Sequence, residues 1–148
     1  LFNRRYLIEF FQREQARALR ERTSLALAMI DLDHFKQLND NHGHLVGDEV
    51  LQAVAQHLQD NLRSTDAVFR IGGEEFLLIL PDVELDEAVS RVDCLRTRAG
   101  AMNVTLSAGV ALWPSHGHAL EELMQAADRA LYQAKRDGRD RVQVSQGS

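Results

Sequence analysis

The sequence predicts a mixed α/β domain with a ferredoxin-like core in the order β-α-β-β-α-β. Residues 24–32 form an almost unbroken apolar run of strand length, which is typical of a strand covered on both faces. Two more apolar runs, at residues 67–69 and 76–80, flank Gly72 and Gly73 and predict a hairpin. We expect a mostly antiparallel central sheet flanked by helices, with the helices of the core on one face.

Composition and charge restrict the function classes. The chain has 148 residues, enough for one domain, and a net charge of −5 from 17 basic and 22 acidic side chains. This acidic balance argues against binding nucleic acid or an anionic membrane through a basic face. The single cysteine, Cys94, excludes an internal disulfide and a cysteine-based zinc site.

The chain begins at Leu1 without a methionine and leads directly into a helical pattern. We expect residues 1–148 to be a single domain excised from a longer protein with a sensor or dimerisation module. No apolar run approaches the roughly 20 residues that span a bilayer. Any membrane anchor would therefore belong to the missing parent regions.

The first half of the chain predicts a helix, a strand, a loop and a second helix. The first helix covers residues 3–22, and the buried strand at 24–32 ends in acidic residues. Residues 34–44 are polar and indicate a loop that holds one turn of helix. The second helix covers residues 46–62, with acidic residues in its first turn, where they favour the helix dipole.

The second half predicts the hairpin and the remaining elements. Gly72 and Gly73 suit a tight hairpin turn, because glycine adopts positive φ freely. A helix follows at residues 85–98 and a long strand at 103–113. The last helix covers 119–137 and is stopped by Gly138, and a short strand at 141–144 precedes a frayed tail at 146–148.

Four carboxylates are expected to meet at one end of the sheet. Asp31 ends the buried central strand, and the hairpin turn that carries Glu74 and Glu75 can come level with it, beside Asp33. Crowded carboxylates repel each other and raise one another's pKa values, a conflict that a hard divalent cation resolves. Mg²⁺ accepts one or two carboxylates and completes its coordination with water and substrate phosphate. The pattern predicts a metal–nucleotide site of the polymerase-palm type.

These acidic residues could also have roles that involve no Mg²⁺. A calcium loop beginning at Asp31 is excluded, because Phe35 occupies its third ligand position and no glycine stands at its sixth. Helix or turn capping would explain Asp33, but it explains Asp31 poorly, because Asp31 ends a buried strand. Glu74 and Glu75 could be solvated charges of the turn.

Several separated motifs resemble the GGDEF domain, the diguanylate cyclase family, in its GGEEF variant. The central motif is Gly-Gly-Glu-Glu-Phe at residues 72–76. The others are the end of the opening motif, the metal and nucleotide motif, the Gly-His-x-x-Gly-Asp segment and the C-terminal signature, at residues 3–5, 31–40, 43–48 and 127–139. Asp140 departs from the usual asparagine. The resemblance implies a palm-type nucleotidyl cyclase-like fold in the bacterial cytosol.

The resemblance also implies a reaction and a metal. The family joins two GTP molecules into cyclic di-GMP and releases two pyrophosphates. By position, Asp31, Glu74 and the Leu32 carbonyl would hold Mg²⁺ or Mn²⁺, with Asp33 beside them as a further metal-site candidate. Glu75 would lie near the ribose hydroxyl that loses its proton, and which of the two glutamates matters more for this step stays open.

The same resemblance assigns the nucleotide contacts. Asn39 and Asp48 would bind the guanine edge, and His44 is a further GTP-site candidate. A carboxylate that accepts from guanine N1–H and N2–H₂ excludes adenine, which lacks that donor pair.

The triphosphate contacts are assigned in the same way. Phe35, through backbone N–H groups, and Lys36 would hold the phosphates. Lys135 and Arg139, four residues apart at a helix end, would bind the β- and γ-phosphates, although charge placed to suit the helix C-terminus also explains them.

Catalysis and its control are expected to involve two copies of the domain. One domain binds one GTP, so a homodimer must bring the 3′-hydroxyl of one nucleotide to the α-phosphate of the other. Five residues separate the end of Arg63-Ser64-Thr65-Asp66 from Gly72, and this segment resembles the Arg-x-x-Asp site at which product cyclic di-GMP inhibits, with Arg91 as an additional candidate.

Two functions are alternatives to diguanylate cyclase activity. The first is a non-catalytic GTP or cyclic di-GMP receptor, against which the complete set of acidic and basic residues argues. The second is a class III-type nucleotidyl cyclase or polymerase palm, which the reaction product distinguishes. Two His-x-His pairs could bind zinc, although surface or hydrogen-bonded histidines explain them better; they are His42, His44, His116 and His118.

Overall fold

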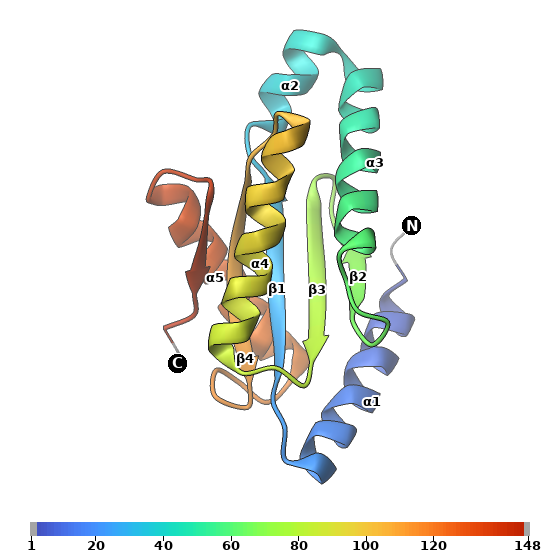
Figure 1. The fold of residues 1–148 in the computed structure, drawn as a ribbon, viewed down its shortest axis with the longest axis vertical. Helices are drawn as coiled ribbons and strands as arrows, with labels where there is room; N and C mark the ends of the chain where they lie inside the picture. Colours follow the sequence, from blue (N-terminus) through green and yellow to red (C-terminus); the bar gives the residue numbers. More distant parts are fainter. Residues whose placement is uncertain (1–2, 147–148) are drawn as a thin grey trace.

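A five-stranded sheet forms the centre of the computed structural model, which describes residues 3–146 (Figure 1). The sheet order is β2-β3-β1-β4-β5, with antiparallel pairs except for the parallel pair β4–β5. The strands are β1 Leu25–Leu32, β2 Ala67–Arg70, β3 Glu75–Pro81, β4 Leu106–Trp113 and β5 Arg141–Val144. Residues 1–2 and 147–148, the ends of the expected domain and of its expected tail, lie outside the described residues.

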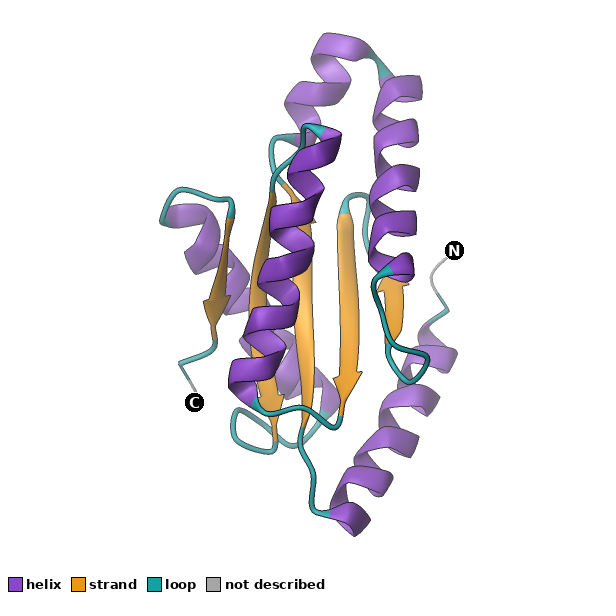
Figure 2. Cartoon of the chain, viewed as in Figure 1, coloured by secondary structure: helices purple, strands orange, loops and turns teal. Residues whose placement is uncertain are grey.

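Helices cover both faces of the sheet (Figure 2). They are α1 Arg4–Glu21, α2 Phe35–His42, α3 His44–Asp60, α4 Leu85–Ala99 and α5 Leu120–Arg136, with a 3₁₀ turn at Gly100–Met102. One apolar cluster joins the sheet to α3 and α4, and a second joins its opposite face to α1 and α5. The ferredoxin-like core with its two helices on one face is confirmed, and α1 and α5 add a layer on the other face.

Strand β1 is central because it has an apolar partner on each side and on each face. All eight of its residues are buried. Alternate residues enter the two clusters, since side chains along a strand point to opposite faces: Ala28 and Ile30 face α3 and α4, whereas Leu27 and Met29 face α1 and α5. An apolar run without alternation is what such a strand requires.

Three local expectations are wrong. The segment after β1 forms the two-turn helix α2 rather than a loop with one helical turn. Strand β4 begins at Leu106, because the chain before it forms the 3₁₀ turn and Asn103 has a φ of 59°. In the hairpin, four residues separate β2 from β3, and Gly72 and Gly73 are not among the residues with positive φ. The hairpin therefore does not use the tight turn that the glycine pair suggested.

Helix α5 approaches β4 unusually closely at Gly109. A Cβ atom at this position would lie 2.1 Å from the Ala127 carbonyl oxygen and 2.3 Å from the Leu131 nitrogen. Glycine is therefore required here by space. The close packing fixes α5 on the sheet and so sets where its C-terminal end lies.

No helix among residues 3–146 combines the length and the apolar character that crossing a membrane requires.

Candidate metal and nucleotide site

The end of β1 and the start of β3 bring the acidic residues to one edge of the sheet. Asp31 is the direct cross-strand partner of Glu75, and the Leu32 N–H donates to the Glu74 carbonyl at 3.3 Å. The prediction that the hairpin comes level with the end of the first strand is confirmed. The register follows from the pairing of the apolar runs, which continues from Leu25 opposite Pro81 to this pair.

Asp31 is a buried carboxylate with one free oxygen. Its Oδ2 accepts a hydrogen bond from Lys135 Nζ, whereas its Oδ1 is buried without a hydrogen-bond partner in the described chain. Burial raises the pKa of Asp31, and the Lys135 ammonium opposes this rise. A buried carboxylate oxygen without a partner suits a site that receives a cation.

The two glutamates of the hairpin are also perturbed. Burial, followed by the charge of Asp31, raises the pKa of Glu74 and of Glu75. The Glu75 carboxylate folds back over the turn, because a Cβ at Gly72 would lie 3.1 Å from its Oε1. Gly72 therefore leaves room for this side chain. A carboxylate with a raised pKa is a better proton acceptor near neutral pH.

A cavity of about 280 Å³ opens at this edge. It is lined by Asp31, Leu32, Asp33, His34, Phe35, Lys36, Gln37, Glu74, Lys135 and Arg139. Phe35 begins α2, so the backbone N–H groups of the first turn have no acceptor within the helix. The structure thus brings the predicted metal ligands and the predicted phosphate contacts to one cavity.

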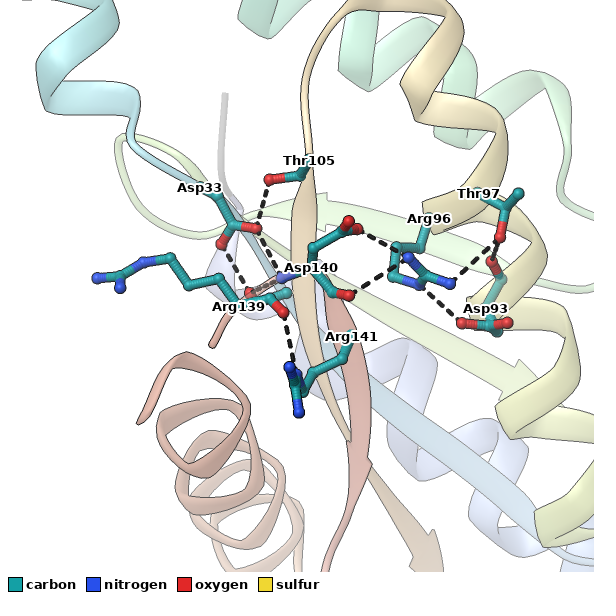
Figure 3. Close-up of polar contacts among 9 residues, drawn as sticks. Asp33, Asp93, Arg96, Thr97, Thr105, Arg139, Asp140 and Arg141 are labelled. Carbon is teal, nitrogen blue, oxygen red and sulfur yellow. Dashed lines mark hydrogen bonds and ion pairs between the residues drawn. The ribbon is translucent and has the colours of Figure 1, made fainter. Parts of the chain in front are cut away.

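Asp33 has hydrogen-bond partners that the sequence did not indicate. Its carboxylate accepts from Thr105 Oγ1 at 2.7 Å, Ser107 Oγ at 2.6 Å and the Asp140 backbone N–H at 3.0 Å (Figure 3). These donors reach both oxygens, so Asp33 supports the loop beside the cavity that it lines. Its place in the metal site stays a prediction. Ser107, fully buried in an apolar strand, was the available sequence signal for this support.

Lys135 and Arg139 reach the cavity from different local structures. Helix α5 ends at Arg136, and Gly138 has a φ of 123°. The Arg139 N–H donates to the Ala134 carbonyl at 2.9 Å, which closes the helix in a Schellman motif. Arg139 therefore lies beyond the helix, and both side chains line the same cavity, so the expectation that they point one way is confirmed. Gly138 ends the helix as predicted.

Asn39 on α2 and Gly47 on α3 lie against each other where the two helices meet. Asn39 Oδ1 is buried and has no hydrogen-bond partner in the described part of the chain. A Cβ at Gly47 would lie 1.7 Å from this oxygen, so glycine makes the space that the Asn39 amide occupies. Asp48, the next residue, is exposed, as is His44 at the start of α3. The sequence motif included Gly47 without a physical reason for it.

A second polar cluster joins the three residues predicted for inhibition. Asp66 Oδ2 accepts from the Arg63 N–H at 2.8 Å and from the Arg91 guanidinium. Arg63 also donates to the Pro81 carbonyl at 2.8 Å, at the end of β3 opposite to Glu75. Seven residues of strand span about 20 Å, so this cluster is well separated from the acidic edge.

The residues of the acidic edge fit a hard divalent cation. Within residues 3–146 no group of three or more histidine, cysteine or acidic side chains is arranged as a metal cage. Mg²⁺ does not require one, because it takes one or two carboxylates and leaves the remaining positions to water and phosphate. The free Oδ1 of Asp31 and the neighbouring Glu74 provide that number of ligands.

One histidine of the two His-x-His pairs has a structural contact. His116 Nδ1 accepts from the Leu112 N–H at 2.9 Å, as a structural histidine does.

The fold and this edge define a domain of the palm-like, nucleotidyl cyclase type, with a mostly antiparallel sheet that presents acidic residues beside a cavity of about 280 Å³. The chain belongs to the family "Diguanylate cyclase, GGDEF domain", which matches residues 1–141. Diguanylate cyclase DosC of Escherichia coli is 41% identical over 157 aligned positions, which cover 100% of this chain and 34% of DosC. This chain thus spans about a third of the length of that relative.

Solved structures agree with this family. The active GGEEF domain of a diguanylate cyclase from Vibrio cholerae superimposes with a TM-score of 0.90 and 35% identity, covering 100% of this chain and 99% of that one. The GGDEF domain of DgcB from Caulobacter crescentus, solved in complex with c-di-GMP, has a TM-score of 0.83 and 32% identity. That match covers 91% of this chain and 85% of DgcB. The expected family and the palm-like fold are confirmed.

Proposed function

We propose that this domain is a diguanylate cyclase that condenses two GTP molecules into cyclic di-GMP and two pyrophosphates. The observation that carries the proposal is Asp31 with its free Oδ1, which lines one cavity with Glu74 and Lys135 and pairs across the strands with Glu75. Relatives named diguanylate cyclase, about 40% identical over nearly the whole chain, support it. The relatives are longer, so the activity of a full-length parent is part of the proposal.

Asp31, Glu74 and the Leu32 carbonyl are the groups that would hold a magnesium or manganese ion. When bound, the ion would supply Lewis-acid stabilisation of charge on the α-phosphate and on the attacking oxygen. The ion pair of Lys135 with Asp31 lies at the same position, so Lys135 is free to turn to the triphosphate once Asp31 has another cationic partner.

The side chains and backbone groups of the domain would have separate roles in the reaction. Asn39 and Asp48 would bind the guanine edge, with His44 nearby, while Phe35, Lys36 and Arg139 would hold the phosphates. Glu75, whose raised pKa suits a base, would accept the proton of the 3′-hydroxyl as its oxygen bonds to the α-phosphate. The bond to pyrophosphate breaks, and Lys135 and Arg139 would stabilise the charge of this leaving group.

A second copy of the domain is required because each cavity would bind one nucleotide. The two 3′-hydroxyls attack each other's α-phosphates, so the two cavities must face each other and two bonds form in turn. We propose that a homodimer is the active state, placed in the bacterial cytosol, with any membrane anchor in other parts of the parent. Dilution should then lower the specific activity.

The cluster of Arg63, Asp66 and Arg91 is proposed to bind the product. Asp66 is buried and holds the two arginines, whose side chains remain partly exposed and can pair with guanine edges or phosphates. A GGDEF domain solved with c-di-GMP supports binding of this ligand within the family. Because the cluster lies at the far end of β3, inhibition would not require competition for the same cavity.

The first experiment is to strip bound nucleotide, incubate the concentrated protein with GTP and Mg²⁺, and identify products by chromatography and mass spectrometry. Cyclic di-GMP from the wild type but not from Glu74→Ala/Glu75→Ala would support the proposal. A linear dinucleotide or 3′,5′-cyclic GMP would overturn it. Binding of GTP or cyclic di-GMP without turnover, even after fusion to a dimerising coiled coil, would favour the receptor alternative.

A further inference from the structure

The turn that follows α5 has an unusual backbone. Gly138, Arg139 and Asp140 all have positive φ, at 123°, 65° and 48°. Glycine adopts this region freely, but arginine and aspartate do not favour it, so contacts elsewhere must hold the last two residues. Those contacts fix the position of Arg139, which is the arginine assigned to the phosphates.

The backbone of Asp140 is held from the β1 and β4 side. Its N–H lies 3.0 Å from Asp33 Oδ2 and 3.2 Å from Ser107 Oγ. Asp33 is itself fixed by Thr105 and Ser107. The turn is therefore tied to the loop that leads from Asp31 into α2, which carries the other phosphate contacts.

The side chain of Asp140 is held from α4. Arg96 Nη1 donates to Asp140 Oδ1 at 2.7 Å and lies 3.3 Å from its carbonyl oxygen. Arg96 is fixed in turn, because its Nε donates to Asp93 Oδ1 at 2.7 Å and its Nη2 to Thr97 Oγ1 at 3.4 Å. Figure 3 shows the resulting chain from α4 through Asp140 to Asp33. Neither Arg96 nor Asp140 lines the acidic cavity.

Arg139 is the residue that this arrangement leaves available. Its carbonyl accepts from Arg141 Nε at 3.0 Å, but its guanidinium makes no hydrogen bond or ion pair within residues 3–146. The side chain extends away from the network in Figure 3 and lines the cavity with Lys135 and Lys36. The backbone is constrained while the cationic group remains free for an anion.

We propose that Arg96 and Asp140 are positioning residues, which hold the Gly138–Asp140 turn so that Arg139 meets the β- and γ-phosphates of GTP. The inference rests on the proposed phosphate role of Arg139. It concerns Arg96 on α4 and Asp140 in the turn, neither of which is among the residues proposed to contact the nucleotide. A guanidinium fork suits this task, since it bonds Asp93 and Asp140 at once in a fixed plane.

The test measures binding of the α,β-methylene analogue of GTP, which cannot lose pyrophosphate, and of GMP, both with Mg²⁺. Arg96→Leu should weaken analogue binding about ten-fold, because a displaced Arg139 loses a charge-assisted contact with the phosphates, and leave GMP binding within two-fold. Arg98→Leu is the matched control, because Arg98 lies on the same helix and bonds Asn61 outside the network. It should change neither affinity.

Conservative variants separate positioning from general stability and charge. Asp140→Asn keeps an oxygen for Arg96 and tolerates positive φ, so it should bind the analogue almost as the wild type does. Arg96→Lys keeps the charge but lacks the planar fork, and it should lose part of the affinity for the analogue. Arg96→Lys also serves if Arg96→Leu does not fold, which thermal unfolding reports.

A double-mutant cycle with Arg139→Ala decides the matter. Arg96→Leu should have almost no further effect on analogue binding once Arg139 is gone. Additive losses, or an equal loss of GMP binding, would overturn the positioning role while leaving the proposed function intact. If Arg139→Ala itself leaves analogue binding unchanged, the phosphate role of Arg139 fails, and the positioning role fails with it.

Discussion

Lys135 Nζ is hydrogen-bonded to Asp31 Oδ2, which joins the end of α5 to the end of β1 across 104 residues of sequence. The Asp31 side chain is only 6% exposed, and that of Lys135 is 32% exposed. The ion pair therefore compensates a buried carboxylate at the centre of the proposed site. The acidic edge should therefore respond to pH and to divalent metal, because protons and metal ions compete for the carboxylate oxygens of Asp31.

Removal of Lys135 should reveal the cost of burying Asp31. In Lys135→Met the pKa of Asp31 should rise further, because burial is then unopposed. A carboxyl whose pKa is raised by folding contributes stability below its unfolded pKa and loses it as pH rises through the folded pKa. We expect the variant to lose about 1–3 kcal/mol at pH 7.5, less than the 3–5 kcal/mol of a fully buried pair, and much less at pH 4.5.

Urea unfolding without divalent metal, at the two pH values, measures this loss. The double variant Asp31→Asn/Lys135→Met should regain most of the stability at pH 7.5, because no buried charge remains. An equal loss at both pH values would show that packing of the lysine stem, and not charge, dominates.

Gly47→Ala should reduce guanine selectivity without unfolding the domain. Alanine in a helix normally stabilises by about 1 kcal/mol relative to glycine. Here its Cβ would lie 1.7 Å from Asn39 Oδ1, so the amide must move. We expect at least about ten-fold weaker GTP binding and a smaller preference for GTP over ATP, while thermal stability stays near that of the wild type.

Gly100→Ala is the matched control for this variant, since nothing lies within 4 Å of its Cβ position. It should leave both nucleotide affinities unchanged. Full guanine selectivity in Gly47→Ala would remove the link between Gly47 and the nucleotide.

Arg63→Ala should relieve product inhibition. Arg63 is bonded to Asp66 and Pro81, and its side chain is 44% exposed and available to a ligand. Loss of a charge-assisted contact of about 1.5–3 kcal/mol predicts a roughly 10- to 100-fold weaker effect of added cyclic di-GMP. Progress curves with and without added product measure it, with Arg20→Ala, an exposed arginine at the end of α1, as the control. An unchanged plateau in Arg63→Ala would exclude this cluster as the inhibitory site.

His116 should make the domain less stable in mild acid. Burial lowers the pKa of His116, whose Nδ1 accepts from the Leu112 N–H and must be unprotonated to do so. A lowered pKa gives stability that is present above the unfolded value of about 6.5 and is lost as pH falls through the folded value. His116→Asn keeps an acceptor but does not titrate. Its stability, followed by thermal unfolding between pH 7.5 and 5, should fall less than that of the wild type.

Gly109→Ala should weaken both fold and activity, because the added Cβ meets backbone atoms of α5 rather than a flexible side chain. Relieving this contact moves α5 from β4, at a cost of about 1–3 kcal/mol, and displaces Lys135 from Asp31. Chemical unfolding and turnover of GTP measure the two effects. Stability and turnover both equal to those of the wild type would show that the close approach at Gly109 does not set the position of α5.

Much of the fold could be predicted because its signals are local. The apolar run of β1 and the helical spacing in α3, α4 and α5 depend on residues a few positions apart, and the structure has these elements within a few residues of the predicted bounds. The glycine pair of the hairpin was less informative. Glycine permits both a tight turn and open space beside a neighbouring side chain, and the pattern does not distinguish them.

The sequence by itself determined the order of the elements, the central place of β1, and the set of charged residues at one edge. Only the tertiary structure decided what those residues contact. Asp33 turns to Ser107, 74 positions away, and Arg96 reaches Asp140 across 44 positions. Such pairings depend on how α4, α5 and the sheet pack together, which no local pattern encodes. The direction of a side chain depends on its neighbours in space, and the fold as a whole determines which residues those neighbours are.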